Sequence, residues 1–260
     1  MKIPIYQVDS FTDHIFGGNP AAICPLEEWI DPLIMQRIAQ ENNLSETAFY
    51  VPKDDCFEIR WFTPKVEINL AGHPTLATAW VIYNELNYKK NKIKFISHLS
   101  GELNIEKEGD LIIMDFPSNK AEPISEPEIL AEALGKKPSA VLNSRDLLVV
   151  YKSQAEIESI KPNFGLLETI DTFGIIITAP GENCDFVSRF FAPRAGINED
   201  PVTGSAHTIL IPYWAEQLKK NKLNAIQISE RIGKLQCEYL GERVKIAGKA
   251  KLFMKGEIII

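Results

Sequence analysis

The chain contains one short string of residues twice. Residues 62–69 read FTPKVEIN and residues 191–198 read FAPRAGIN, so Phe, Pro, Ile and Asn occupy the same places in both strings. The two copies begin 191 − 62 = 129 residues apart, which is almost half of the 260-residue chain. A repeat with this spacing predicts two related halves, each with its own copy of the same substructure.

Each copy leads into a short stretch with a glycine, and each stretch opens an apolar segment. The first is Ala71-Gly72-His73-Pro74 before residues 75–83, and the second is residues 200–205 before residues 205–215. Both segments are apolar on nearly all sides, which predicts helices enclosed by other structure. Helix starts carry unpaired N–H groups and about half a positive charge. We therefore expect the two starts to suit an anion such as a carboxylate.

Composition narrows the class of protein. The length fits about two domains, and 45% hydrophobic residues can form a packed core in each. The net charge of −7 argues against general binding to nucleic acid or to anionic membranes, which requires a basic surface. No run of about eighteen apolar residues and no leader-like N-terminal pattern occurs, so we expect a cytoplasmic protein. The cysteines show no CxxC pair and are expected to be reduced and mostly buried; they are Cys24, Cys56, Cys184 and Cys237.

Local patterns predict mostly strands, with few helices. A helix is expected from Asp31-Pro32 to about Asn42, because Asp31 can cap it and Pro32 suits its first turn. Shorter helices are expected where Ser125 and Ser153 begin capping-box spacings. The expected strands are residues 3–8, 46–51, 56–62, 92–97, 102–107, 111–115, 146–151, 173–178, 184–191, 226–229, 235–239 and 242–247.

The polar, proline-bracketed segment 117–123 is the best candidate for a linker between the halves. We therefore expect an N-terminal domain of residues 1–117 and a C-terminal domain of residues 118–250. The last residues, 251–260, read as a final strand that could pair with either half and is provisionally assigned to the N-terminal one.

Three residues could carry chemistry, although position alone favours a structural role for each. Glu46 stands where a polar turn enters an apolar strand, and an exposed strand residue is the simpler interpretation. His73 lies at the start of the first buried helix, where it could handle a proton or only fill a turn. Asp200 precedes Pro201 and could orient a substrate or only form an Asx turn.

Taken together, four strings around these residues resemble the phenazine-biosynthesis isomerase family known as PhzF. In chain order they are residues 18–22 (GNPAA), 43–49 (NLSETAF), 71–77 (AGHPTLA) and 200–207 (DPVTGSAH). The resemblance spans nearly the whole chain. It implies an α+β fold of two pseudo-symmetric domains, each a mostly antiparallel β-barrel around a central α-helix, as in diaminopimelate epimerase, with the active site in the cleft between them.

The resemblance also implies roles for individual residues. Glu46 matches the family's general acid/base, and His73 and Asp200 look like its proton-handling and substrate-binding partners. Residues that resemble the substrate-binding part of the site are Asn19, Gly72, Gly204 and Ser205. A small-molecule carboxylate substrate, a homodimer and a reaction without cofactor or metal are further expectations. Pro74 stands where many relatives have Ala, which the first turn of a helix tolerates.

The chemistry sets a physical demand on Glu46. A base that takes a proton from carbon near neutral pH works best with a pKa of about 6–7, so we expect this carboxyl group to be partly desolvated. N–H groups at the helix starts could then stabilise developing negative charge on the substrate.

Two other functions remain open. A racemase or epimerase of the same fold would use one thiol at each helix start, but Ala71 and Thr203 stand at those positions. A non-catalytic small-molecule binder could keep the cleft, although binding alone does not need an acid/base set. Replacing Glu46 by Gln distinguishes such a binder from an enzyme. An enzyme should lose turnover while it still binds its ligand, whereas a binder should lose little.

Overall fold

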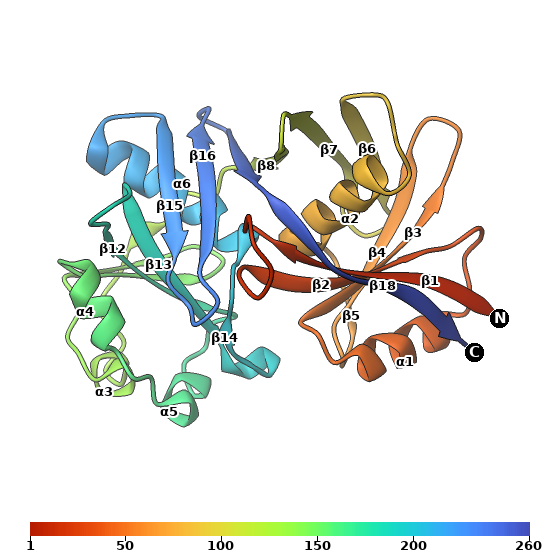
Figure 1. Cartoon of the computed structure of the whole chain (residues 1–260). Helices are drawn as coiled ribbons and strands as arrows, with labels where there is room; N and C mark the ends of the chain where they lie inside the picture. The colour runs from red at the N-terminus through yellow and green to blue at the C-terminus, as the bar shows by residue number, and fades with distance from the viewer. The chain divides into compact units, whose positions relative to one another are not determined.

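The computed structural model describes residues 1–260, which divide into two compact units (Figure 1). Unit 1 comprises Met1–Asp115 and Ala247–Ile260, and unit 2 comprises Phe116–Ile246. The expected division lay at residues 117/118, with the final strand provisionally assigned to the N-terminal part. Each unit has its own set of paired strands and its own enclosed helix. No helix of the chain is both long and apolar enough to cross a bilayer.

The sheet of unit 1 is mixed but mostly antiparallel. Its hydrogen-bonded order is β18, β1, β2, β3, β4, β6, β7 and β8, with the short β5 beside β4. Only β2–β3 and β4–β6 among these pairs are parallel. The strands are β1 (Lys2–Ser10), β2 (Asn19–Pro25), β3 (Glu46–Pro52), β4 (Phe57–Phe62), β5 (Glu67–Ile68), β6 (Lys92–Ser97), β7 (Gly101–Glu108), β8 (Leu111–Pro117) and β18 (Ala250–Ile259).

The predicted buried helix of unit 1 is α2 (Gly72–Asn84), which packs against β1, β2 and β3. Ser10 of β1 donates a hydrogen bond to the His73 carbonyl at 2.8 Å, which anchors the start of the helix. The second helix, α1 (Pro32–Asn42), begins where the sequence predicts, because the Asp31 side chain accepts a hydrogen bond from Leu33 N–H. Local capping thus fixes α1, whereas enclosure by the sheet stabilises α2.

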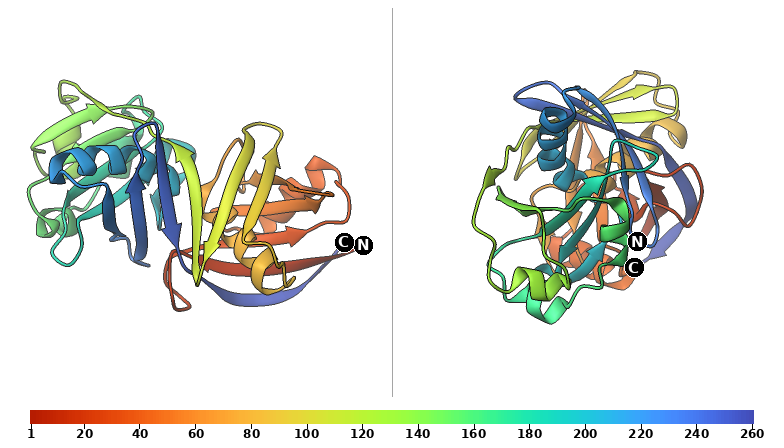
Figure 2. Two further views of the ribbon diagram at one scale, coloured as in Figure 1. Left: turned by 90° about the horizontal axis from the view of Figure 1, so that it is seen from above. Right: turned by 90° about the vertical axis from the view of Figure 1, so that its left-hand side faces the viewer.

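Unit 2 repeats this plan. Its hydrogen-bonded order is β9, β10, β11, β12, β13, β15 and β16, with the short β14 beside β13, and β11–β12 and β13–β15 are the parallel pairs. The strands are β9 (Glu122–Pro123), β10 (Ala140–Asn143), β11 (Leu147–Val150), β12 (Ile175–Pro180), β13 (Phe186–Ala192), β14 (Ile197–Asp200), β15 (Lys222–Gln227), β16 (Gly233–Tyr239) and β17 (Arg243–Gly248). The helices are α3 (Leu130–Leu134), α4 (Gln154–Ser159), α5 (Phe164–Glu168), the 3₁₀ turn η1 (Pro193–Ala195) and the enclosed α6 (Gly204–Leu218). Figure 2 shows both enclosed helices from two further sides.

The repeated string has the same structural role in both units. In unit 1 it forms the turn from β4 into β5, where Trp61 lies opposite Ile68. In unit 2 it forms the turn from β13 into β14, where Ala192 lies opposite Ile197. Each short strand then leads into the enclosed helix of its unit. The sequence repeat therefore marks a structural repeat.

Pro212 lies inside α6, where it cannot donate to the carbonyl of Thr208 four residues earlier. The backbone N–H of Asn119 donates to that carbonyl instead, at 3.0 Å, and the Asn119 amide donates to the Thr208 hydroxyl at 2.9 Å. The segment predicted as a linker thus also satisfies the carbonyl that Pro212 leaves free.

One local prediction is wrong, and one strand was not predicted. The capping-box spacing at Ser125 does not start a helix. The next helix, α3, begins at Leu130 and has no side-chain cap. Strand β2 was not among the expected strands; its two prolines, Pro20 and Pro25, lie near its ends, where the ladder tolerates them. The helix predicted after Ser153 is present, with the Ser153 hydroxyl capping Glu156 N–H.

Candidate active site

Glu46 and His73 come together in unit 1. Glu46 is the first residue of β3, and His73 is the second residue of α2. Oε2 of Glu46 lies 3.2 Å from Nε2 of His73, and the two side chains are only 11% and 5% exposed. Glu46 is therefore not the exposed strand residue that its position in the sequence favoured. It is a largely desolvated carboxyl group within hydrogen-bond reach of an imidazole.

Asn19 fixes the imidazole from the other side. Asn19 and Glu46 are the first residues of β2 and β3. Because these neighbouring strands are parallel, both residues lie at the same end of the strands, where α2 begins. Nδ2 of Asn19 lies 3.1 Å from Nδ1 of His73. An amide nitrogen can only donate, so Nδ1 accepts and the ring proton is on Nε2, the nitrogen that lies 3.2 Å from Oε2 of Glu46. The two groups are in contact, but Nε2 and Oε2 do not have hydrogen-bond geometry.

Burial keeps the His73 ring uncharged. It lowers the pKa of His73 to about 3, and the Pro20 carbonyl, which favours the protonated ring, is the weaker influence. His73 is therefore a neutral donor near neutral pH. Such a donor can orient the Glu46 carboxylate without carrying a full charge into the site.

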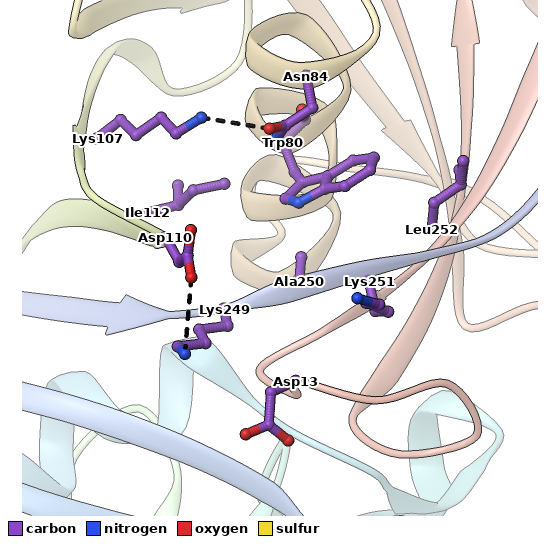
Figure 3. Close-up of a pocket in the computed structure, with 10 residues that line it drawn as sticks. All are labelled: Asp13, Trp80, Asn84, Lys107, Asp110, Ile112, Lys249, Ala250, Lys251 and Leu252. Carbon is purple, nitrogen blue, oxygen red and sulfur yellow. Dashed lines mark hydrogen bonds and ion pairs between the residues drawn. The ribbon is translucent and has the colours of Figure 1, made fainter.

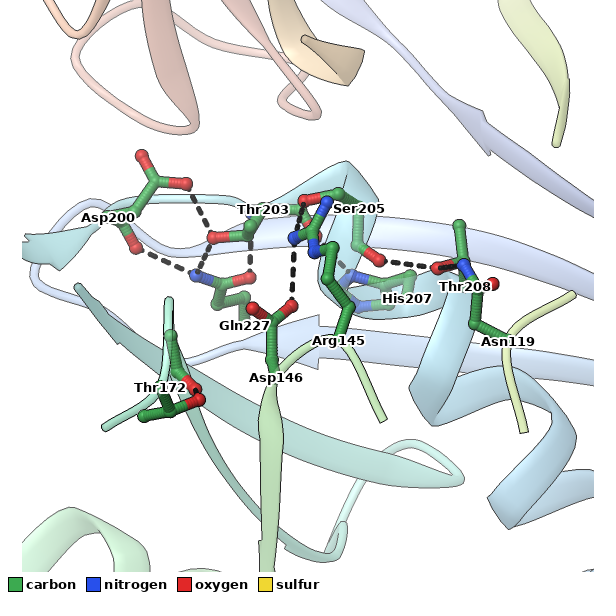
Figure 4. Close-up of polar contacts among 11 residues, drawn as sticks. Asn119, Arg145, Asp146, Thr172, Asp200, Thr203, Ser205, His207, Thr208 and Gln227 are labelled. Atoms are coloured by element: carbon green, nitrogen blue, oxygen red, sulfur yellow. Dashed lines mark hydrogen bonds and ion pairs between the residues drawn. The ribbon is translucent and has the colours of Figure 1, made fainter. Parts of the chain in front are cut away.

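Asp200 lies in unit 2, at the end of β14, and is 7% exposed. The Thr203 hydroxyl donates to Oδ2 of Asp200, so the carboxylate is held across the loop that precedes α6 (Figure 4). The contact orients the carboxylate of Asp200 within its own unit.

Gln227 of β15 organises the same loop and was missed by the sequence analysis. Its amide nitrogen donates to the Asp200 carbonyl at 2.7 Å and to the Thr203 hydroxyl at 3.2 Å, and its oxygen accepts from Thr203 N–H at 2.8 Å (Figure 4). Gln227 is fully buried. A single glutamine in a strand carries no local signal for this role, because its partners are more than twenty residues away.

Gly204 and Ser205 are the first two residues of α6. Nη2 of Arg145 lies 3.0 Å from the Ser205 hydroxyl oxygen and 2.8 Å from Oδ2 of the buried Asp146 (Figure 4). The guanidinium also lies 5.3 Å from the centre of the Phe173 ring. Arg145 and Asp146 were likewise not foreseen, because an Arg-Asp pair in a polar loop resembles any surface turn.

The two helix starts carry no thiols. Ala71 is the N-cap of α2 and Thr203 is the N-cap of α6, and the first residue of α2 is the predicted substrate-binding Gly72. All four cysteines are free, as predicted. Cys24 and Cys237 are buried, and burial raises the pKa of both thiols far above its usual range. The chain therefore lacks the paired thiols of a two-thiol racemase. No group of three or more His, Cys, Asp or Glu side chains is placed to hold a metal ion.

Comparison with known proteins shows the family of the chain. Residues 8–256 match the family model described as phenazine biosynthesis-like protein, PhzC-PhzF. The chain belongs to this family. It is 49% identical to an uncharacterized isomerase of Pseudomonas aeruginosa over 99% of both chains. A crystal structure of a PhzF family protein from Enterococcus faecalis is 46% identical over 100% of both chains, with a TM-score of 0.98.

A more distant structure shares the fold alone. A predicted epimerase from Pseudomonas aeruginosa is 19% identical over 99% of both chains, with a TM-score of 0.77. The expected fold of two pseudo-symmetric, mostly antiparallel domains around central helices is thereby confirmed. The expectation that this PhzF family member is an enzyme of the isomerase class is confirmed as well. The roles of individual site residues remain predictions.

Proposed function

We propose that this PhzF family member shifts a proton within a small unsaturated or cyclic carboxylic or amino acid by general acid/base catalysis. Glu46 takes a proton from one carbon as a carboxylate and returns it to another as a carboxylic acid. One observation carries the proposal: a buried carboxyl group lies 3.2 Å from a neutral imidazole that Asn19 holds in place. This is the arrangement that a base working on carbon requires, since burial removes the water that would otherwise compete for the carboxylate.

His73 supports Glu46 in this scheme. Its protonated Nε2 lies 3.2 Å from Oε2 of Glu46, so it is placed to stabilise the carboxylate form of Glu46 before proton abstraction. The N–H groups in the first turn of α2, which begins at Gly72, are suited to bind the substrate's carboxylate. Asp200, Gly204 and Ser205 of unit 2 are proposed to take part in substrate binding, and this assignment comes from the family resemblance.

Other parts of the proposal also come from the resemblance. They are a small-molecule carboxylate substrate, catalysis without a cofactor and a homodimer. The proposed cytoplasmic location comes instead from the sequence pattern described above. None of them determines which molecule is turned over, because a shared scaffold and a shared base allow many substrates.

Isotope exchange tests the proposed reaction without knowledge of the product. Candidate unsaturated and cyclic acids are first screened for those that raise the melting temperature of the purified protein. Each compound found is then incubated with the enzyme in heavy water and analysed by mass spectrometry. Incorporation of deuterium at carbon is expected, and turnover of the compound without any such incorporation would contradict proton transfer through an exchangeable base.

Glu46→Gln separates catalysis from binding. Loss of general acid/base catalysis should slow exchange by about 10²- to 10⁴-fold, while the compound still raises the melting temperature. Glu41→Gln, which makes the same chemical change at an exposed residue near the end of α1, should exchange at the normal rate. A non-catalytic binder would show no exchange with either protein.

A further inference from the structure

Unit 1 contains a cavity that the proposed reaction does not use. Its volume is about 460 Å³, which is within the usual range for small-molecule sites. The lining residue Trp80 follows His73 by 80 − 73 = 7 residues on α2. At 1.5 Å per residue, this places it about 10 Å further along the helix axis. The cavity is therefore separate from the Glu46–His73 pair.

Part of the cavity lining is apolar and includes an indole ring. Trp80, Ile112, Ala250 and Leu252 form this part of the lining, and Figure 3 shows the Trp80 ring directed into the space between α2 and β18. Every other residue of α2 from His73 to Tyr83 is buried, so Trp80 is the one side chain that this stretch of the helix leaves partly accessible. A flat aromatic face beside aliphatic groups suits a planar ring.

Charged side chains form most of the remaining lining, and positive ones outnumber negative ones. They are Lys107, Lys249, Lys251, Asp13 and Asp110. Three ammonium groups against two carboxylates give a local net charge of 3 − 2 = +1, in a chain whose net charge is −7. The excess favours a ligand with a single negative charge. The carboxylates oppose a dianion, and the lysines oppose a cation that could otherwise stack on Trp80.

The lysines are not locked into strong ion pairs. Lys249 approaches Asp110 only to 3.9 Å, and both side chains are largely exposed, so this pair contributes little. Lys251 is exposed beside it on β18. Lys107 lies 3.3 Å from the Asn84 side-chain oxygen. Lys249 and Lys251 are therefore available to a ligand.

We propose that this cavity binds a small aromatic monocarboxylate. Its ring lies against Trp80 and the aliphatic side chains, and its carboxylate lies near the ammonium groups of Lys249 and Lys251. The inference is independent of the proposed isomerase reaction, since it uses none of the groups assigned to proton transfer.

Nuclear magnetic resonance of the tryptophan indole N–H groups tests the proposal on the full chain. The chain has four tryptophans, and Trp80→Phe identifies the signal of Trp80 by its loss. Titration with benzoate should shift that signal in a saturable way. Benzyl alcohol, which lacks the charge, and benzylamine, which has the opposite charge, should shift it much less. Absence of a saturable shift with benzoate, or equal binding of benzylamine, would overturn the proposal.

A double variant tests the role of the lysines. Lys249→Gln combined with Lys251→Gln should raise the Kd for benzoate by at least about threefold, as expected for the loss of exposed charge interactions. Lys89→Gln combined with Lys90→Gln, which removes the same charge from an exposed turn outside the cavity, should leave the Kd unchanged. Melting temperatures confirm that both double variants are folded. Equal affinity of the two for benzoate would contradict the assignment.

Discussion

Nε2 of His73 lies 3.2 Å from Oε2 of Glu46, although the two residues are 73 − 46 = 27 positions apart and belong to a helix and a strand. The imidazole proton is on Nε2, the nitrogen beside the carboxylate, because the Asn19 amide donates to the other ring nitrogen. The three side chains act together. The Asn19 amide determines the tautomer of His73, and the tautomer determines that Nε2 carries the proton. Changes to any one of them should therefore act through Glu46.

His73→Leu should change the pH dependence of deuterium exchange as well as its rate. Without the Nε2–H donor, the carboxylate form of Glu46 is less favoured, so the acidic limb of the pH–rate profile should move to higher pH. His73→Gln, which keeps a donor, should restore the profile in part. A slower rate with an unchanged profile in both variants would indicate that His73 only supports the structure.

The free energy of unfolding should fall below about pH 6.5. Burial lowers the pKa of His73 to about 3 and that of His207 to about 4, whereas an unfolded histidine titrates near 6.5. The unfolded chain therefore binds more protons in this range, and stability is lost as the pH falls towards the folded pKa values. Each histidine should contribute a loss of about 2 kcal/mol between pH 7 and pH 5, measured by urea denaturation.

His207→Asn tests whether His207 contributes to this pH dependence of stability. Nδ1 of His207 lies 2.8 Å from the Thr203 carbonyl, and an asparagine amide can donate in its place. Between pH 7 and pH 5, the variant should lose only about half of the unfolding free energy that the two histidines together are expected to cost. A pH dependence equal to that of the unaltered protein would exclude His207 as a contributor.

Gln227→Leu should destabilise the protein through the loop before α6. It leaves Thr203 N–H and the Asp200 carbonyl without the partners that the buried amide provides. We expect a loss of about 2–4 kcal/mol in the free energy of unfolding. Gln236→Leu makes the same change at an exposed position of β16 and should stay within about 0.5 kcal/mol. Similar losses in the two variants would contradict the role of these contacts.

Gly18→Ala should be more harmful than Gly101→Ala, although both glycines have positive φ angles, of 61° and 73°. A β-carbon at Gly18 would lie 2.0 Å from the Ser10 carbonyl oxygen, whereas one at Gly101 would meet no atom within 4 Å. Gly101→Ala should cost about 1 kcal/mol, and Gly18→Ala should cost at least about 2 kcal/mol because the backbone must move. Thermal and urea denaturation measure the difference, and equal losses would show that the close approach has no effect.

The string around Gly18 explains why part of the site was recognisable. Gly18 is required by its φ angle and by the nearness of Ser10, and it places Asn19 at the start of β2. The backbone conformation of Gly18 and the placement of Asn19 involve neighbouring residues, so both features are visible in the sequence as a short motif. Gln227 has no such motif, because its partners on β14 and before α6 approach it only when the sheet of unit 2 forms.

The sequence by itself determined the features that depend on neighbouring residues: the twofold repeat, the cap of α1 at Asp31, and the two helices apolar enough to require enclosure. Tertiary structure decided that Glu46 is buried and that Gln227 braces the Asp200 loop. The physical reason is the range of the interactions. Caps and turns act over a few residues, whereas burial and pairing depend on strands such as β2 and β3, which are distant along the chain and become neighbours only in the folded sheet.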